Sequence, residues 1–228
     1  MLEGVLSVPF WVELLATLTG ALSGSMHAVK HEYDFFGVAC LACVTGLAGG
    51  IIRDLLLQDY GIYAFQRWEL ILLCIGVAIP VFFFCRLLEK FDLPMDILDT
   101  VSFALFAIIG ASKAWAAGMA VLPSTILGTI TAVGGGMMRD LLIIREPKIF
   151  QSGTLYAVAA FVGALVFTLM KHFAILPDAA AWIGLAIILV LRFVSVFFHI
   201  ETKPARDYSD KVEALVQRMQ AKANRRDR

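Results

Sequence analysis

The sequence predicts an all-α integral membrane protein with seven transmembrane helices, arranged as two inverted three-helix repeats followed by a seventh helix. Of its 228 residues, 60% are hydrophobic and 17% are charged, and the mean hydropathy is +0.81. Soluble domains contain about 45–50% apolar and about 25% charged residues, and they still need a polar surface. Seven apolar stretches approach the length of about 20 residues that a bilayer requires. We therefore expect lipid to surround most of the chain.

The membrane domain is predicted to cover residues 1–200. Its spans are residues 9–28, 35–57, 70–88, 95–114, 119–144, 155–170 and 176–200. They are separated, in order, by the segments VKHEYD, QDYGIYAFQRWE, EKFDLP, KAWAAG, REPKIFQSG and KHFAILPD. The first repeat thus covers about 9–88, the second about 95–172 and the seventh helix about 176–200. Residues 201–228 form a charged tail, in which a short amphipathic helix and a solvated, partly disordered segment are equally compatible with the pattern.

The distribution of lysine and arginine predicts the orientation. With the N-terminus outside, the cytoplasmic loops contain Lys30, Arg86, Lys90, Arg145 and Lys148, and the opposite loops contain Arg67, Lys113 and Lys171. The tail after Ile200 is also rich in both residue types. Because cytoplasmic loops are enriched in Lys and Arg, we expect the N-terminus outside and the C-terminus in the cytoplasm. The first span is expected to be retained, because the residues before it contain Glu3 and lack the basic region of a signal peptide.

The most informative feature is an internal repeat. The segment AGGIIRDLLL at residues 48–57 matches GGGMMRDLLI at residues 134–143, and one shift of about 86 residues also aligns positions in the preceding span. The aligned pairs are Gly49 with Gly135, Gly50 with Gly136, Arg53 with Arg139, Asp54 with Asp140, Glu13 with Asp99, Gly24 with Gly110 and His27 with Lys113. Each unit contains three spans, so the second copy enters the membrane from the opposite face. Inverted repeats usually contain a site at their interface, lined by interrupted helices.

The repeated glycines and arginines are the candidate site. Consecutive glycines allow close helix packing or local unwinding beside protein or water. An arginine within the membrane costs about 2.5–3.5 kcal/mol even on lenient scales, so a partner is expected; snorkelling to the interface is the alternative. The aspartate after each arginine points about 100° away on a helix and is a poor partner. We therefore predict the ion pairs Arg53–Glu13 and Arg139–Asp99, with Asp96 as another partner for Arg139.

Several other chemistries are not indicated. The net charge is zero and the pI is near 6.9, so no basic field recruits nucleic acid. No nucleophile–base set, metal-ligand spacing or cofactor motif is recognisable, so we expect neither an enzyme nor a bound metal or cofactor. Cys40 and Cys43 form a C-x-x-C pair without a second Cys/His pair, and we interpret them as small residues on one helix face. His27 and His31, spaced i, i+4, are expected near an interfacial loop.

At the doubled motif, the chain resembles the prokaryotic branch of the trimeric intracellular cation (TRIC) channel family, which overlaps bacterial proteins described by a glycine-transporter domain. The similarity covers about residues 10–200. It implies a homotrimer in the inner membrane of a prokaryote, surrounded by lipids, with one pore for monovalent cations such as K⁺ and Na⁺ inside each protomer. It also implies pore-lining or gating roles for Gly49, Gly50, Arg53, Asp54, Gly134, Gly135, Gly136, Arg139 and Asp140. The first copy reads AGG where the second reads GGG, so the two helix kinks are expected to differ.

Three functions remain open at this point. A potassium-permeable cation channel is the first interpretation, although arginines beside a cation path are unfavourable unless Glu13 and Asp99 neutralise them or they form a gate. The second is a secondary transporter of a small zwitterion such as glycine, in which an arginine holds the carboxylate and an acid holds the ammonium group. The third is a structural membrane protein whose arginine–acid pairs only lock the packing.

Overall fold

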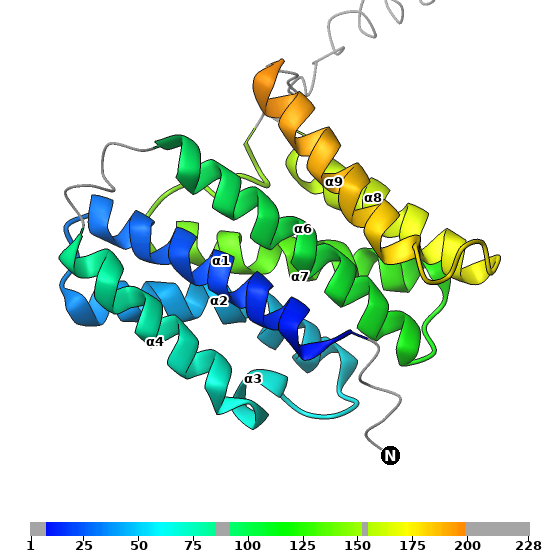
Figure 1. Cartoon of the computed structure of the whole chain (residues 1–228), viewed down its shortest axis with the longest axis horizontal. Coiled ribbons are helices and arrows are strands. Elements are labelled where there is room, and N and C mark those ends of the chain that lie inside the picture. Colours follow the sequence, from blue (N-terminus) through cyan, green and yellow to red (C-terminus); the bar gives the residue numbers. More distant parts are fainter. Residues whose placement is uncertain (1–7, 85–91, 152–154, 199–228) are drawn as a thin grey trace, which may run out of the picture.

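The computed structural model describes residues 8–84, 92–151 and 155–198, and within these ranges helices are the only regular secondary structure (Figure 1). The helices are α1 (Phe10–Lys30), α2 (Phe35–Leu57), α3 (Tyr63–Gln66), α4 (Trp68–Phe83), α6 (Asp92–Ala116), α7 (Val121–Leu142), α8 (Tyr156–His172) and α9 (Ala180–Phe197). The predicted seven-helix fold is confirmed, with the four-residue α3 added between α2 and α4. The predicted tail, residues 201–228, lies outside the described residues, as do the predicted ends of the third and seventh spans.

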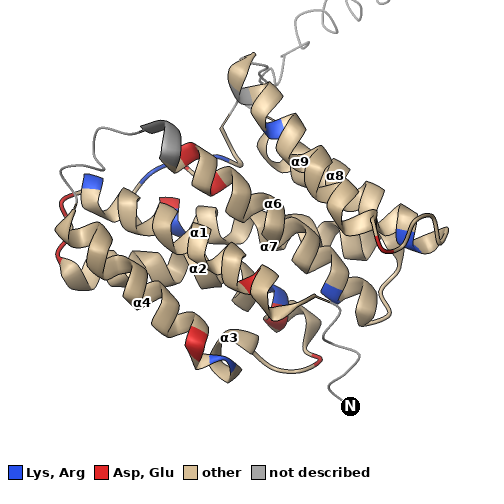
Figure 2. Cartoon of the chain, in the orientation of Figure 1, with Lys and Arg blue, Asp and Glu red and all other residues tan. Residues whose placement is uncertain are grey.

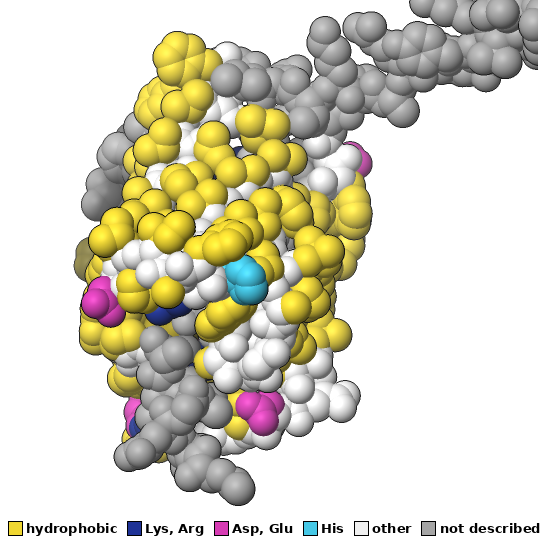
Figure 3. Space-filling model, turned by 90° about the vertical axis from the view of Figure 1, so that its right-hand side faces the viewer, with side chains coloured by type: hydrophobic (Ala, Val, Ile, Leu, Met, Phe, Trp, Pro, Cys, Tyr) yellow, Lys and Arg dark blue, Asp and Glu magenta, His cyan; other side chains and the backbone are white. Residues whose placement is uncertain are grey.

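The helices differ in how well they match a bilayer. By length and composition, α2, α7 and the part of α6 over Met95–Ala116 can cross a membrane. In α4, α8 and the Ala180–Ser195 part of α9, the apolar stretch is shorter. Large apolar side chains are exposed along the outside of the protein, among them Phe36, Leu72, Phe83 and Trp182, and hydrophobic atoms cover most of the face in Figure 3. Arg139 and Asp140, by contrast, are buried. This distribution is the one expected of a protein surrounded by lipid.

The equivalent helices of the two repeats run in opposite directions. Near the start of α1, Glu13 forms an ion pair with Lys113 near the end of α6. Near the end of α1, the Ser23 hydroxyl lies 3.4 Å from a carboxylate oxygen of Asp99, near the start of α6. The two helices are therefore antiparallel neighbours, as Figure 1 also shows. The repeats are inverted relative to each other, which places the start of each repeat beside the end of the first helix of the other.

The second helices of the repeats, α2 and α7, cross at their glycines. A Cβ atom built on Gly49 would lie well under 3.0 Å from the carbonyl oxygen of Thr131, and one on Gly135 equally close to the carbonyl oxygen of Thr45. Both contacts join repeat-equivalent residues, so the crossing is symmetric. A Cβ on Gly134 would lie 3.1 Å from the Cα of Gly49. Side chains larger than hydrogen would thus force the two backbones apart.

Local unwinding at the glycines, one of the two uses expected for them, does not occur in this structure, and the expected kinks stay a prediction. Both α2 and α7 are α-helical without a break from their first to their last residue. The glycines are used for close approach of two backbones, and no unwinding is needed to accommodate the arginines that follow them. Sequence alone could not separate the two uses of glycine, because both require the same residue.

Asp34 fixes the start of α2. Its carboxylate oxygen accepts a hydrogen bond of 2.8 Å from the Gly37 N–H, the usual N-cap interaction. Replacing Asp34 with alanine is expected to lower the free energy of unfolding by about 1 kcal/mol, whereas asparagine keeps the cap. Thermal unfolding in detergent would measure the difference. Equal stability of the alanine and asparagine variants would show that the cap contributes nothing.

Candidate functional site

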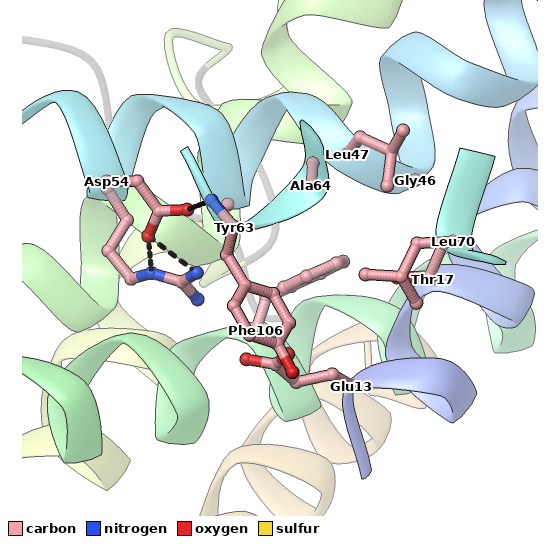
Figure 4. Close-up of a pocket in the computed structure, with 11 residues that line it drawn as sticks. Glu13, Thr17, Gly46, Leu47, Asp54, Tyr63, Ala64, Leu70 and Phe106 are labelled. Atoms are coloured by element: carbon pink, nitrogen blue, oxygen red, sulfur yellow. Dashed lines mark hydrogen bonds and ion pairs between the residues drawn. The ribbon is translucent and has the colours of Figure 1, made fainter. Parts of the chain in front are cut away.

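One group of charged residues lies where α2 ends and α3 begins; we call Glu13, Arg53, Asp54 and Lys113 the Arg53 cluster. The Arg53 guanidinium donates to Asp54 through Nε at 2.8 Å, and its Nη2 lies 2.7 Å from the same oxygen. The other Asp54 oxygen accepts the Tyr63 backbone N–H at 2.9 Å (Figure 4). Both side chains are almost completely buried. The arginine is therefore hidden from lipid and does not snorkel to the interface.

Two tyrosines from the α2–α4 connection complete this cluster. The Tyr60 hydroxyl donates to Asp54 at 2.7 Å. Burial raises the pKa of Tyr60 above its ordinary value, so the phenol stays protonated and remains a donor. The Lys113 ammonium lies 4.0 Å from the Tyr63 ring centroid and 5.3 Å from that of Tyr60, a favourable cation–π arrangement. The sequence of this segment carries only a loop signal and therefore predicted no role for either tyrosine.

Glu13 binds Lys113 and not Arg53, which corrects the predicted Arg53–Glu13 pair. The Glu13 carboxylate and the Lys113 ammonium form an ion pair, and both side chains are buried. The antiparallel packing of α1 and α6 brings the last turn of α6 to the level of Glu13, while Asp54 already satisfies Arg53. The distribution of charges predicted Lys113 in a loop. The signal that could have found it is the repeat itself, which aligns Lys113 with His27 in the corresponding turn of α1.

A second group, the Arg139 cluster, comprises Asp99, Arg139, Asp140 and Lys148. Arg139 Nη1 lies 2.7 Å from an Asp99 oxygen and 3.0 Å from the Ser23 hydroxyl. Its Nε donates to Asp140 at 2.9 Å. The structure thus brings Arg139 and Asp99 together, as the repeat predicts. The Arg139 side chain is completely buried.

Lys148 also forms an ion pair with Asp96, which lies outside the Arg139 cluster. Lys148 lies 3.3 Å from Asp99 and 3.2 Å from Asp96. Asp96 is therefore a partner of the lysine and not of Arg139, contrary to the second predicted possibility. The adjacent aspartates were also judged to be poor partners of their arginines, and this was wrong in both repeats. The arginine side chain is long enough to fold back, so the 100° between Cβ directions does not keep the guanidinium from its neighbour.

The two clusters are related by the inverted repeat, and neither carries a net positive charge. Each contains two bases and two acids, with the more exposed Asp96 as a further acid beside Lys148, and three of the four positions are repeat equivalents. One cluster lies at the start of α1 and the other at its end, and Figure 2 shows charged residues gathered toward helix ends. Buried ion pairs rarely increase stability over well-packed apolar residues. Ionisable groups inside a membrane protein are most often functional, so these clusters are the candidate site.

Each cluster borders a small cavity. The Arg53 cavity has a volume of about 20 Å³ and is lined by Glu13, Thr17, Gly46, Leu47, Gly50, Arg53, Asp54, Tyr63, Ala64, Leu70 and Phe106. The Arg139 cavity has a volume of about 10 Å³ and is lined by Thr45, Asp99, Ser102, Phe103, Phe106, Ala132, Gly135, Gly136 and Tyr156. A water molecule needs about 10–15 Å³ of such space. Each cavity is therefore of the size of one water molecule.

The remaining candidate glycines lie at these cavities. A Cβ on Gly50 would be 3.6 Å from Arg53 Nη2, and one on Gly136 would be 3.0 Å from the Tyr156 hydroxyl and 3.8 Å from Arg139 Nη2. The guanidinium groups would thus be in ordinary van der Waals contact with an added Cβ, and only the Tyr156 hydroxyl beside Gly136 would be crowded. Gly49, Gly134 and Gly135 form the crossing of α2 and α7, and Gly135 also lines the Arg139 cavity. The predicted glycines thus lie either at the crossing of α2 and α7 or beside an arginine, and the inverted repeat relates the positions in α2 to those in α7.

Comparison with known proteins identifies relatives of the whole membrane part. A family model described as Glycine transporter matches twice, over residues 10–86 and 96–172. A UPF0126 membrane protein of Deinococcus radiodurans is 35% identical over 81% of this chain and 86% of its own length. The UPF0126 inner membrane protein YadS of Escherichia coli is 32% identical over 84% of this chain and 93% of its own length.

Solved structures with the same fold are cation channels. The TRIC trimeric intracellular cation channel orthologue from Rhodobacter sphaeroides is 29% identical, with a TM-score of 0.79 over 83% of this chain and 97% of that chain. A structure from work on conductance through TRIC cation channels is 28% identical, also with a TM-score of 0.79, and covers 89% of this chain and 100% of that one. A prokaryotic TRIC channel in 0.5 M KCl is 27% identical with a TM-score of 0.77, over 82% and 95% of the two chains.

Proposed function

Because this membrane protein belongs to the family described as Glycine transporter and has the fold of the prokaryotic TRIC channels, we propose that it is a channel for monovalent cations. The proposed route lies within one protomer, between the two inverted repeats. It passes the Arg53 and Arg139 clusters, with the glycines of α2 and α7 beside it. The observation that carries the proposal is the pair of largely buried clusters without net positive charge at opposite ends of the α1–α6 contact. The proposal assigns the chain no enzymatic step and no cofactor.

The charge balance answers the main objection to a cation route. An unpaired arginine beside a narrow, low-dielectric path would repel a cation strongly. In each cluster, two acids offset two bases, so a cation that approaches meets no net positive charge. Arg53 is paired with Asp54, and Arg139 is bonded to Asp99, Asp140 and Ser23, so neither arginine is a free charge beside its cavity. Permeation of K⁺ and Na⁺ is thus compatible with arginines in these positions.

The cavities are water-sized and separate, so we propose that the described arrangement is a closed state. Conduction then requires the route to widen. The consecutive glycines support α2 and α7 as the elements that move, because such residues lower the cost of bending a helix. We further propose a homotrimer with one such route in each protomer, by analogy with the trimeric structures that this chain resembles.

The proposed membrane placement follows the relatives and the charge distribution. YadS is an inner membrane protein, and we propose the same membrane for this chain, with lipids against its exposed apolar side chains. Lys30 at the end of α1 and the loop residues Arg145 and Lys148 line one pocket at the same end of the protein. This supports an orientation with that end in the cytoplasm and the N-terminus outside.

Recording from purified protein in planar bilayers tests the channel proposal. We expect discrete steps of K⁺ current in KCl without glycine, because a channel needs no co-substrate. The variants Arg53→Ala and Arg139→Ala, recorded beside the parent, are expected to change the current, since each upsets the charge balance of one cluster. Saturable, electrically silent uptake of glycine, with no current steps in KCl, would instead support a carrier and contradict the proposal.

A further inference from the structure

The ring of Phe106 lies between the two cavities. Among the described residues, Phe106 alone lines both the Arg53 cavity and the Arg139 cavity. It lies in the middle of α6 and is 7% exposed. Figure 4 includes its side chain with Glu13 and Thr17 among the residues around the Arg53 cavity. One phenyl group thus borders a water-sized space on each side of it.

The inverted repeat makes this position asymmetric. The repeat equivalent of Phe106 is Gly20 in α1. A Cβ on Gly20 would lie 2.9 Å from the Ser102 hydroxyl and 3.0 Å from the Cα of Gly46. The space beside Gly20 is therefore filled, and a second side chain does not fit there. A single ring from one repeat occupies the region where the two repeats meet.

Both cavities contain polar side chains, whereas the residues that pack against the Phe106 ring are apolar. The Arg53 cavity contains the Glu13 carboxylate and the Thr17 hydroxyl, and the Arg139 cavity contains the Asp99 carboxylate and the Ser102 hydroxyl. Phe106 packs in a small cluster with Ala16 and Ile109. An apolar constriction between hydrated spaces stops ions by excluding water.

We propose that Phe106 is the apolar barrier of the conduction route, and that displacement of its ring joins the two cavities into one hydrated passage. This inference rests on the proposed channel function and names the residue at which the route is closed. The ring packs against α1 at Ala16, and the space beside Gly20 on the same helix is filled. The ring therefore needs a small separation of α1 and α6 to move aside, and this separation would open the passage.

Single-channel recording of Phe106 variants in KCl tests the barrier. Phe106→Ala is expected to raise the K⁺ current per protein by roughly tenfold, which corresponds to a barrier lowered by about 1.4 kcal/mol. Phe106→Leu should give an intermediate increase and Phe106→Trp a decrease, since the side chain volume at the constriction sets the barrier. These two variants retain a large apolar side chain, so they report on the barrier even where Phe106→Ala folds poorly.

A matched control removes a buried phenyl group elsewhere. Phe167 in α8 is 1% exposed and lines neither cavity. Phe167→Ala should therefore cost stability without raising the current. A parent that conducts K⁺, with Phe106→Leu and Phe106→Trp indistinguishable from it, would overturn the barrier and leave the channel function intact. Silence of the folded parent and of every folded Phe106 variant would instead overturn the channel function and the barrier together.

Discussion

Replacing Arg139 with methionine is expected to lower the free energy of unfolding by about 3–5 kcal/mol, the usual cost of removing one partner from a buried ion pair. The substitution removes the bonds to Asp99, Asp140 and Ser23. Methionine fills similar volume, so little of the loss comes from an empty cavity. Asp99 keeps a contact with Lys148 at 3.3 Å, which leaves Asp140 as the more severely affected acid. Chemical unfolding in mixed micelles would measure the change.

Arg67→Met is the matched control for this prediction. Arg67 is 44% exposed and lies 4.0 Å from Glu69, and exposed pairs of this kind contribute about 0–1 kcal/mol. Adding Asp99→Leu to Arg139→Met should recover part of the lost stability, because a pair removed whole leaves fewer unpaired groups than half a pair. Equal losses for Arg139→Met and Arg67→Met would contradict a buried, bonded arginine.

Gly49→Ala is expected to have the next largest effect. The added methyl group would lie well under 3.0 Å from the Thr131 carbonyl oxygen, which is part of the α7 backbone and cannot turn away. The two helices must therefore separate, and we expect a loss at or above the upper end of the roughly 1–3 kcal/mol that overpacking costs. Gly135→Ala should behave alike, because it makes the equivalent contact with Thr45. Thermal unfolding in detergent would give the order of the variants.

Gly76→Ala in α4 is the control at a position with open space. No heavy atom lies within 4 Å of a Cβ built on Gly76, so alanine should stabilise the helix by roughly 0.5–1 kcal/mol. The two substitutions are chemically identical and differ only in their surroundings. If alanine were tolerated equally at both positions, α2 and α7 would not be in backbone contact at the crossing.

Much of the fold could be predicted because hydropathy and the repeat carry it directly. The lengths of the apolar stretches predict the seven helices. The odd number of spans in each repeat predicts that the second repeat is inverted relative to the first. The Arg139–Asp99 contact followed from the same reasoning, since the topology brings the start of α6 beside the end of α7. These inferences depend on the direction of each helix and on the alignment of the two repeats, and both can be read from the sequence.

The partners of individual charges could not be predicted in the same way. Helical periodicity gives the direction of Cβ, whereas the guanidinium of Arg53 lies several bonds further and folds back to Asp54. Lys113 was counted among the loop residues at the end of its span, although α6 in fact continues to Ala116. The position of Phe106 was equally hidden, because its equivalent is Gly20. Only the packing of α1 against α6 shows that one ring borders both cavities.

Current block by silver ions at introduced cysteines is the most direct test of a route within the protomer. In a protein whose own cysteines are replaced, Ser102→Cys places a thiol in the Arg139 cavity and Thr17→Cys places one in the Arg53 cavity. Silver is a monovalent cation that binds thiolates, so it should enter wherever K⁺ passes. We predict that Ag⁺ blocks the K⁺ current of both variants and leaves Leu72→Cys, on the exposed outer face of α4, unaffected. A K⁺ current that persists in Ag⁺ at both cavity positions would contradict a route between the two repeats.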